Sequence, residues 1–532
     1  MFGSTKLIRE NFALNQLQIS LLGSAVINFF HSFCFIVNRL EFSQHFWLEL
    51  TLHFFLVFSF LFFCSFNKKI FLIAAFLLLA LSTISAFFYN QFGIIIDQST
   101  LTNADENKGD AASLLNIFSV IFYLIFFLAL PFFIFVKLQI KKQNPLKYLP
   151  IIAFIFLIFS AILAPFEHNL RKDIILRSYA PVSLIEAIRG YWVEQSIAKE
   201  SLKNLKPIAE ILPDLTFSEK KIPNLKVVFV IGESARQKNF SLNGYERETN
   251  PLLSKVKNLL SFKDVTPCYT YTSQAVSCLM SFDKSKLSES DKKTMVLDEE
   301  SVIKAFEKLG FSTAWFSMQK AVGNNNSLLI LASQSQKYFF DNQVRNITTD
   351  DKYDEALLRP LAEEIKKPGK NFIILQGNGS HFLFDERYPE SFKKFPPTCS
   401  KKDPKTCTRQ ELVNSYDNSI LYTDYFLSQV IARLKNENAI LFYVSDHGQF
   451  LGEENLFYHG NSETRTKAQH RVPLLIWMSD SLLKNKTYAK RFENAAQKTS
   501  KEISHANIFD SLLQCSGADS KAFERNLSLC RQ

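Results

Sequence analysis

Three apolar stretches decide how the second half of the chain folds: VVFVIGE (227–233), NFIILQGNGSH (371–381) and AILFYVSDHG (439–448). Each is a short apolar run that ends on side chains able to bind a metal ion. Runs of this kind are typical of strands buried on both faces of a sheet. The carboxyl ends of parallel strands meet at one edge of an open α/β sheet. We therefore expect Glu233, His381, Asp446 and His447 to converge at one edge.

Further apolar runs of the same length occur between these stretches and after them. FSTAWFSM (311–318) and VPLLIWMS (472–479) are examples, and helical stretches such as DEESVIKAFEKLG (298–310) alternate with them. Strands that alternate with helices indicate a mostly parallel central sheet with helices on both faces. We expect this α/β domain to occupy residues 216–532 and to be soluble.

The first part of the chain has a different character. Hydrophobic residues make up 47% of the sequence and include 53 Phe, and the longest apolar runs lie within residues 1–166. Five runs approach the ~20 residues that cross the hydrocarbon core of a bilayer. They are residues 17–37, 46–66, 70–89, 115–137 and 149–166. Neither buried core helices nor a cleaved signal peptide explains five successive runs well, so the sequence predicts a five-helix transmembrane domain.

Basic residues in the short loops predict how this domain is oriented. They lie at the start of the chain, after the second run and after the fourth run, which is one side of the membrane if five helices cross it. That side is expected to be cytoplasmic, which puts residues 167–532 outside. Residues 167–215 are amphipathic and basic. We interpret them as a linker at the membrane surface, with an ordinary solvent-exposed linker helix as the alternative.

The eight cysteines agree with an oxidising compartment. Cys34 and Cys64 fall inside predicted membrane helices and are expected to stay free. The other six form close couples in the sequence: Cys268 with Cys278, Cys399 with Cys407, and Cys515 with Cys530. Such local couples indicate disulfides outside the cytoplasm. Free thiols or a metal cluster are the alternatives, although no CxxC spacing favours a cluster.

A candidate nucleophile lies in the loop between the first couple, CYTYTSQAVSC (268–278), although composition alone favours an ordinary helix cap. It holds the hydroxyls of Thr270, Thr272, Ser273 and Ser277. A hydroxyl bound to Zn²⁺ can lose its proton near neutral pH, and a helix start offers N–H groups to a phosphate. The alternative is an ordinary Ser/Thr-rich helix cap.

Several motifs together resemble those of the phosphoethanolamine transferases. This family belongs to the alkaline phosphatase and sulfatase superfamily and includes lipid A modifying and mobile colistin-resistance enzymes. The matching stretches are VVFVIGESARQKNFSLNGYERETNP (227–251), CYTYTSQAVSC (268–278), GNGSHFLFDERYP (377–389) and SDHGQFLGEENLFYHG (445–460). The resemblance implies a sulfatase-like catalytic domain in the periplasm and a multi-pass anchor in the bacterial inner membrane.

The resemblance also implies a zinc ion held by Glu233, Thr272, Asp446 and His447. Thr272 would be the catalytic nucleophile. It would take phosphoethanolamine from phosphatidylethanolamine, form a phospho-threonine intermediate and release diacylglycerol. The acceptor would be an envelope molecule, in the first place lipid A or lipooligosaccharide, which links the family to polymyxin resistance.

Three further residues receive roles from the same resemblance. His381 and His459 would bind the phosphoryl group or a second zinc ion, and one of them would protonate the leaving oxygen. Asn103 matches a residue for the lipid donor in the loop 90–114. The stretch WFSMQKAVGNNNS (315–327) lacks the DNNS form of the colistin-resistance branch, so no acceptor contacts carry over there.

Two other classes of function compete with this interpretation. A phosphoglycerol transferase, or a phosphatase or sulfatase-type hydrolase, is the nearest alternative, but the sequence after Cys278 lacks the C/S-x-P-x-R pattern of a sulfatase nucleophile. A non-catalytic protein with a degenerate domain would need to have lost a metal ligand. The net charge of +10 suits an anionic membrane surface, and no aromatic-interleaved basic patch indicates nucleic-acid binding.

Overall fold

The structure is a computed structural model of the 532-residue chain. It describes residues 13–37, 46–92, 96, 101, 117–141, 182–201, 204–218, 222–283, 297–319, 327–341, 343–344, 352–401, 403–453, 456–459, 468–524 and 526–531. The chain divides into two compact units, of which the first holds residues 1–101 and 114–191 and the second holds 102–113 and 192–532. The predicted boundaries at 166 and 215 stay predictions.

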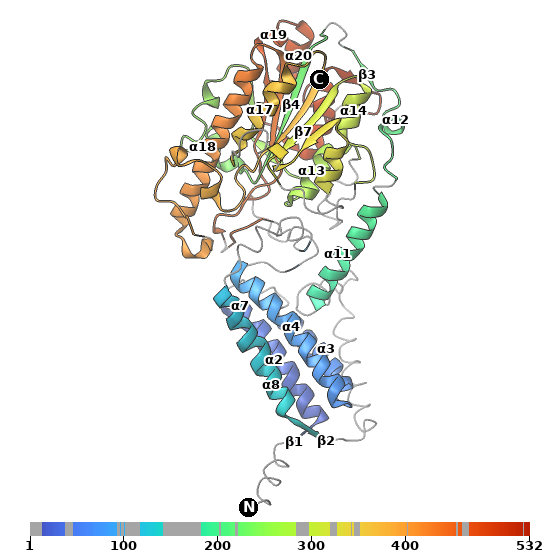
Figure 1. The fold of residues 1–532 in the computed structure, drawn as a ribbon, viewed down its shortest axis with the longest axis vertical. Coiled ribbons are helices and arrows are strands. Elements are labelled where there is room, and N and C mark those ends of the chain that lie inside the picture. Colours follow the sequence, from blue (N-terminus) through green and yellow to red (C-terminus); the bar gives the residue numbers. More distant parts are fainter. Residues whose placement is uncertain are drawn as a thin grey trace, which may run out of the picture. The chain divides into compact units, whose positions relative to one another are not determined.

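The first unit is a bundle of long apolar helices (Figure 1). Its elements are α2 (Gln16–Val37), α3 (Phe46–Cys64), α4 (Lys68–Phe92), α7 (Ile117–Tyr123), the π-helical turn η1 (Leu124–Ala129) and α8 (Leu130–Lys137). Ile27, Leu61, Phe71 and Phe135 pack in its interior. Many large apolar side chains face outward instead, and Phe118 is 81% exposed. An apolar exterior over an apolar interior is what a helix bundle in lipid requires.

Four of the five predicted spans fall on these helices. Within the described part of the chain, the stretches Lys68–Phe88 and Ile117–Lys137 are long and apolar enough to cross a membrane. The fifth predicted span, 149–166, lies outside the described residues, so the count of five stays a prediction. The linker prediction covers α11 (Val182–Ser201), in which Leu184 and Ala187 are buried while Trp192 is 65% exposed.

The second unit is built on a seven-stranded sheet in the order β5-β11-β10-β4-β9-β7-β8. The strands are β4 (Leu225–Gly232), β5 (Leu259–Phe262), β7 (Ser312–Ser317), β8 (Lys337–Phe339), β9 (Asn371–Gln376), β10 (Asn438–Ser445) and β11 (Leu474–Met478). The five strands from β10 to β8 are parallel, but β11 runs antiparallel to both of its neighbours. The sheet is therefore mixed, with a parallel centre.

Helices cover both faces of this sheet (Figure 1). The helices α13 (Thr272–Met280), α14 (Val302–Lys308), α15 (Ser327–Ser333), α20 (Lys486–Ala496) and α21 (Ile508–Ser516) share one hydrophobic core with alternate residues of the strands. In β4 these residues are Val227, Phe229 and Ile231. The helices α17 (Leu358–Ile365) and α18 (Arg409–Leu434) lie against β9 and β10 on the other face.

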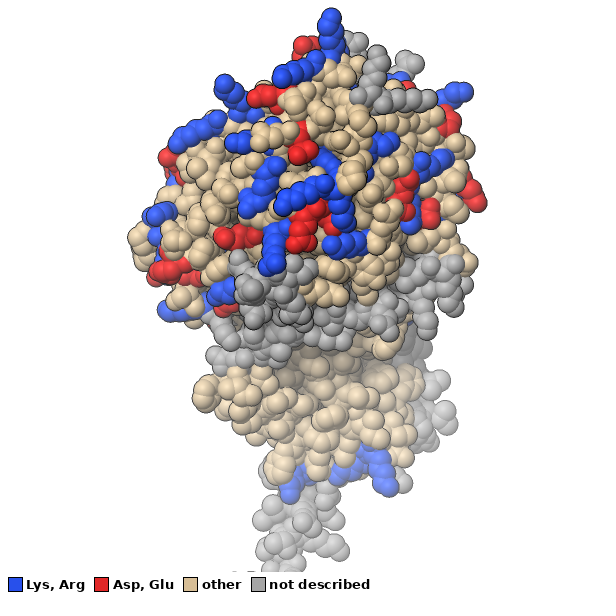
Figure 2. Space-filling model, turned by 45° about the horizontal axis from the view of Figure 1, so that its top comes forward, with Lys and Arg blue, Asp and Glu red and all other residues tan. Residues whose placement is uncertain are grey.

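The surfaces of the two units differ in charge. Among the described residues on the face shown in Figure 2, Lys and Arg alternate with Asp and Glu over the α/β unit, while the helical unit shows few charges. Three disulfides, all in the α/β unit, join Cys268 to Cys278, Cys399 to Cys407 and Cys515 to Cys530. Cys64 is free, and the side chain of Cys34 lies outside the described residues.

Candidate active site

The register of two parallel strands creates the centre of the site. Gly232 of β4 lies opposite Ser445 of β10, so the residues that follow, Glu233 and Asp446, leave the sheet side by side. His447 comes next, and its Nε2 atom lies 3.6 Å from Oε1 of Glu233 and 3.3 Å from Oδ2 of Asp446. All three side chains are at most 1% exposed. The strand-end convergence expected from the sequence is thus present for these residues.

Thr272 lies at the first position of α13, against this group of side chains. Its Oγ1 donates a hydrogen bond to Oε2 of Glu233 at 3.1 Å and lies 3.3 Å from Nε2 of His447. The disulfide Cys268–Cys278 closes the loop around it. Among the rival hydroxyls, that of Ser277 donates to the Ser273 carbonyl of its own helix. Thr272 is the hydroxyl that reaches the carboxylate and the imidazole.

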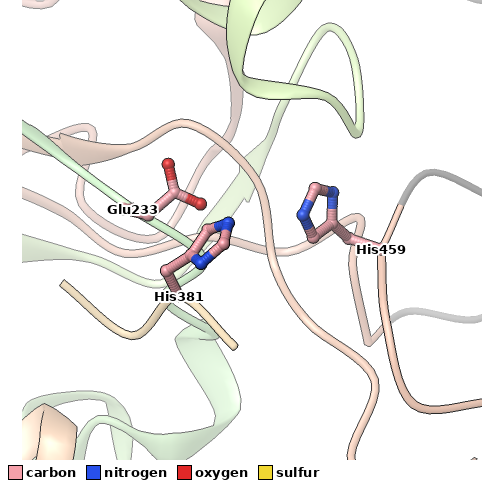
Figure 3. Close-up of side chains that lie close together, drawn as sticks. All are labelled: Glu233, His381 and His459. Atoms are coloured by element: carbon pink, nitrogen blue, oxygen red, sulfur yellow. The ribbon is translucent and has the colours of Figure 1, made fainter. Parts of the chain in front are cut away.

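His381 and His459 face the same space from two other segments (Figure 3). The imidazole of His459 stacks on His447 with 4.0 Å between ring centroids, and its Nδ1 lies 2.9 Å from the Thr270 carbonyl oxygen. His381 lies 6.2 Å from His459, measured between ring centroids. The structure therefore brings together every predicted site residue except Asn103, which lies outside the described residues.

The turn that carries His381 is pressed onto the backbone of Glu233. The N–H group of Ser380 donates to the Glu233 carbonyl at 2.9 Å. Gly379 has a φ of +45°, and a Cβ atom added there would lie 2.8 Å from the same carbonyl oxygen. Glycine is required here for both its left-handed backbone and its lack of a side chain.

Burial disfavours charge throughout the site. It raises the pKa of Glu233, to which the like charge of Asp446 adds, and it raises the pKa of Asp446 to about 6. Burial also lowers the pKa of His447, and it lowers the pKa of His459 well below its ordinary value, beside the other imidazoles. Two crowded carboxylates next to neutral imidazoles form a group that a cation would stabilise.

The donor atoms fit a divalent metal ion. Nδ1 of His447 lies 2.8 Å from the carbonyl oxygen of Gly448, which can only accept, so the Nε2 lone pair faces the carboxylates. Oδ2 of Asp446 is buried and accepts no hydrogen bond from the described residues. One ligand atom from each of Glu233, Asp446 and His447 lies within 4.8 Å of the others, and the same holds for Glu233, His381 and His459. Oxygen and imidazole ligands of this kind suit zinc.

Three residues that the sequence motifs did not indicate also contact the site. Ser234 donates from Oγ to Oε1 of Glu233 at 2.6 Å and from its N–H group to Oδ1 of Asp446 at 3.0 Å. Gln319 donates to Oε2 of Glu233 at 2.7 Å. Arg387 donates to the backbone carbonyls of His381 and Phe382. The available signal was position, because Ser234 and Gln319 directly follow strands that end at this edge.

Comparison with known proteins identifies the class of protein to which this chain belongs. A sequence model of the sulfatase family matches residues 226–518, which is more than half of the chain and includes all the site residues of the α/β unit. The chain therefore belongs to the sulfatase family. A second model, described as "Phosphoethanolamine transferase EptA/EptB", matches residues 50–195. Together the two matches place the chain among the phosphoethanolamine transferases of the alkaline phosphatase and sulfatase superfamily.

Individual relatives agree with this placement. The Kdo(2)-lipid A phosphoethanolamine 7''-transferase of Escherichia coli K12 is 29% identical over 65% of this chain, and the match spans 60% of that relative. The integral membrane lipooligosaccharide phosphoethanolamine transferase A of Neisseria meningitidis has the same fold, with a TM-score of 0.76 over 97% of both chains at 22% identity.

A third relative was solved with a metal ion. The periplasmic domain of EptC from E. coli, in complex with zinc, is 25% identical, with a TM-score of 0.51 over 62% of this chain and 90% of that one.

Proposed function

We propose that this chain transfers phosphoethanolamine from phosphatidylethanolamine to lipid A or lipooligosaccharide, with Thr272 as the nucleophile. The observation that carries the proposal is the placement of the Thr272 hydroxyl at the start of α13, within 3.1 Å of Glu233 Oε2 and 3.3 Å of His447 Nε2. Kinship with phosphoethanolamine transferases supports the group that is transferred.

A zinc ion is the expected cofactor. Glu233, Asp446 and His447 would hold it together with Thr272, and the zinc complex of the EptC relative supports the choice of metal. When bound, zinc would lower the pKa of the threonine hydroxyl and offset negative charge on the phosphoryl group.

In the first step, Oγ1 of Thr272 attacks the phosphorus of phosphatidylethanolamine. A bond forms between Oγ1 and phosphorus, and the bond from phosphorus to the glycerol oxygen breaks. The leaving oxygen takes up a proton and departs as diacylglycerol, while Thr272 keeps the phosphoethanolamine group. The N–H groups in the first turn of α13 would be available to the phosphoryl oxygens, because a helix start stabilises negative charge.

The two outer histidines differ in which ring nitrogen carries the proton. Nδ1 of His459 faces the Thr270 carbonyl and so carries the proton, which leaves the Nε2 lone pair to accept one. Nη2 of Arg387 lies 3.4 Å from Nδ1 of His381. A guanidinium can only donate, so Nε2 of His381 would carry the proton. We therefore assign Nε2–H of His381 to donate a hydrogen bond to the phosphoryl group. Nε2 of His459 would take the proton of Thr272 in the first step and pass it to the leaving oxygen.

In the second step, an oxygen of the acceptor attacks the phospho-threonine. The new bond joins that oxygen to phosphorus, and the bond to Thr272 breaks and restores the hydroxyl. In this step His459 would take the proton of the acceptor oxygen and return it to Oγ1 of Thr272, so one site is used twice and ends in its starting state.

The proposed location is the periplasmic side of a bacterial inner membrane. The apolar helices of the first unit support a membrane anchor, and three disulfides support an oxidising compartment for the α/β unit. Donor and acceptor lipids would both be in reach of an enzyme anchored in this way.

The decisive experiment is intact-mass analysis of the full-length protein after incubation with phosphatidylethanolamine, followed by peptide mapping. The expected result is a gain of one phosphoethanolamine on Thr272 and loss of this adduct after zinc is chelated. An adduct on Thr270 or Ser277 would refute the assignment of the nucleophile. A fully active protein without any divalent metal would refute the proposed zinc site.

A further inference from the structure

Gln319 contacts the same carboxylate oxygen as the nucleophile. It lies two residues after the end of β7, in the stretch WFSMQKAVGNNNS (315–327). Its side-chain Nε2 donates to Oε2 of Glu233 at 2.7 Å, and the Thr272 hydroxyl donates to this oxygen at 3.1 Å. An amide group therefore takes part in orienting the first acidic residue of the site.

A chain of hydrogen bonds orients that amide. Oε1 of Gln319 accepts from Nε2 of Gln376 at 3.0 Å, and Oε1 of Gln376 accepts from the hydroxyl of Ser317 at 3.0 Å. Ser317 and Gln376 lie opposite each other on β7 and β9 and are at most 1% exposed. This chain of hydrogen bonds thus begins in the buried centre of the sheet.

The backbone N–H group at one end and the Glu233 carboxylate at the other set the direction of these hydrogen bonds. The N–H group of Gln319 donates to Oγ of Ser317 at 3.0 Å, and a backbone N–H can only donate. The Ser317 proton is therefore free to point at Gln376, which in turn donates to Gln319. The oxygen of Gln319 therefore accepts from Gln376. The NH₂ group of Gln319, and not its oxygen, faces Glu233.

This arrangement leaves the other carboxylate oxygen for the metal site. Oε1 of Glu233 lies 3.6 Å from Nε2 of His447, which is itself 3.3 Å from Oδ2 of Asp446. Ser234 also donates to Oε1, at 2.6 Å, but a carboxylate oxygen has two lone pairs and keeps one for a cation.

We propose that Gln319 is a positioning residue that holds Oε2 of Glu233 through this one-directional chain, so that Glu233 presents Oε1 to a divalent cation beside Asp446 and His447. The inference rests on the proposed metal site and adds to it a partner outside the ligands. Groups that orient metal ligands commonly change metal affinity tenfold to a hundredfold when they are removed.

The test is the affinity of the full-length protein for zinc, measured in detergent by competition with a chromophoric chelator. Gln319→Met should bind zinc about tenfold to a hundredfold more weakly than the wild type. Gln319→Glu, which keeps the size of the side chain but has no N–H to donate, should show the same loss and serves if the first variant folds poorly. Gln376→Met should also weaken binding, because Gln319 then loses its orientation.

A double variant and a control separate positioning from a general effect on folding. In the Gln319→Met background, Gln376→Met should cause little further loss, because the hydrogen bonds that connect Gln376 to Glu233 are already interrupted. Gln334→Met is the matched control, since this buried glutamine accepts a hydrogen bond from the N–H group of Ser301 and makes no contact with the site. It should leave zinc affinity within twofold of the wild type.

The possible failures are distinguishable. If the wild type binds zinc and Gln319→Met binds it within twofold as tightly, the positioning role is wrong and the metal site stands. Additive losses in the double variant, or an equal loss in Gln334→Met, would also overturn it. If the wild type binds no zinc, the proposed metal site falls and the inference falls with it.

Discussion

The two ends of β4 each bury a charged side chain, and they treat it in opposite ways. At the start of the strand, Lys226 is 2% exposed, and its Nζ donates to the carbonyls of Lys367 and Gly369 and to Oδ1 of Asn371. Just past the end of the strand, Glu233 is 1% exposed and lies beside Asp446, whose Oδ2 accepts no hydrogen bond from the described residues. Both charged groups are buried and hydrogen-bonded, but only Glu233 lies beside a second group of the same charge that has an oxygen without a donor among the described residues.

The contrast separates a structural charge from a functional one. Burial lowers the pKa of Lys226 and raises the pKa of Glu233, so the protein disfavours both charges. Three acceptors compensate the ammonium group at one end. At the other end, a second carboxylate adds like charge, and a bound cation would compensate both carboxylates. The predictions below test whether the two ends contribute to stability and to activity in this opposite way.

The largest effect is expected from Thr272→Ala at the functional end. Transfer should fall by at least about a thousandfold, because no other hydroxyl among the described residues reaches both Glu233 and His447. Zinc should stay bound through Glu233, Asp446 and His447, and the unfolding midpoint should hardly move. Transfer assays with a labelled phosphatidylethanolamine, run beside zinc analysis, check this. Wild-type transfer by the variant would contradict the proposal.

The disulfides extend the comparison beyond the strand. Replacing Cys515 and Cys530 with Ala should lower the free energy of unfolding by about 3 kcal/mol, as expected for a closed loop of this size, and leave the activity of the folded enzyme intact. Replacing Cys268 and Cys278 should reduce activity as well, because this bond closes the loop that carries Thr272. Chemical denaturation and transfer assays on both pairs distinguish them. An equal loss of activity in the two double variants would contradict the distinction between a structural and a functional disulfide.

At the structural end, Lys226→Met should destabilise the protein by about 2–3 kcal/mol. The ammonium group is removed while Oδ1 of Asn371, which is buried, and two carbonyl oxygens lose their donor, and a buried group is costly to leave unpaired. Zinc affinity and transfer by the folded fraction should stay at wild-type levels. A variant that unfolds like the wild type but transfers poorly would show that the two ends are coupled.

The smallest effect should have the opposite sign. Asp446→Asn removes one of two crowded carboxylates, and burial already raises the pKa of this one to about 6, so its charge opposes folding at pH 7. Without metal, the variant should be more stable than the wild type by about 1 kcal/mol, and its zinc binding should be lost. Denaturation in the presence of a chelator measures this. A less stable variant would mean that Asp446 contributes to the fold.

The sequence predicted those site residues that stand at the end of an apolar, strand-like run and also belong to a motif. Glu233 and Asp446 each end a continuous apolar run, and parallel pairing of β4 and β10 then suffices to bring them together. The sequence also correctly predicted that strands and helices alternate in the second unit. The antiparallel direction of β11 was not foreseen, because VPLLIWMS is as apolar and as short as the strands of the parallel centre, and composition carries no direction.

Residues that act through hydrogen bonds were harder to find. Gln319, Gln376 and Ser317 are spread over two strands, and a glutamine after a strand has many ordinary roles. Only the pairing of β7 with β9 puts them in one chain. Asn103 and the fifth predicted span lie outside the described residues, and the expectations about them stand as they were made.

The close packing of Gly379 on Glu233 has a consequence for how this site tolerates mutation. A single methyl group at this position would collide with the backbone of the neighbouring strand end and push the turn that carries His381 away. Such a variant would keep every reactive group of the site in its sequence and still lose their arrangement. Random mutation can therefore inactivate the protein at positions with no chemistry of their own, and a search for weakened variants should include the glycines between the functional side chains.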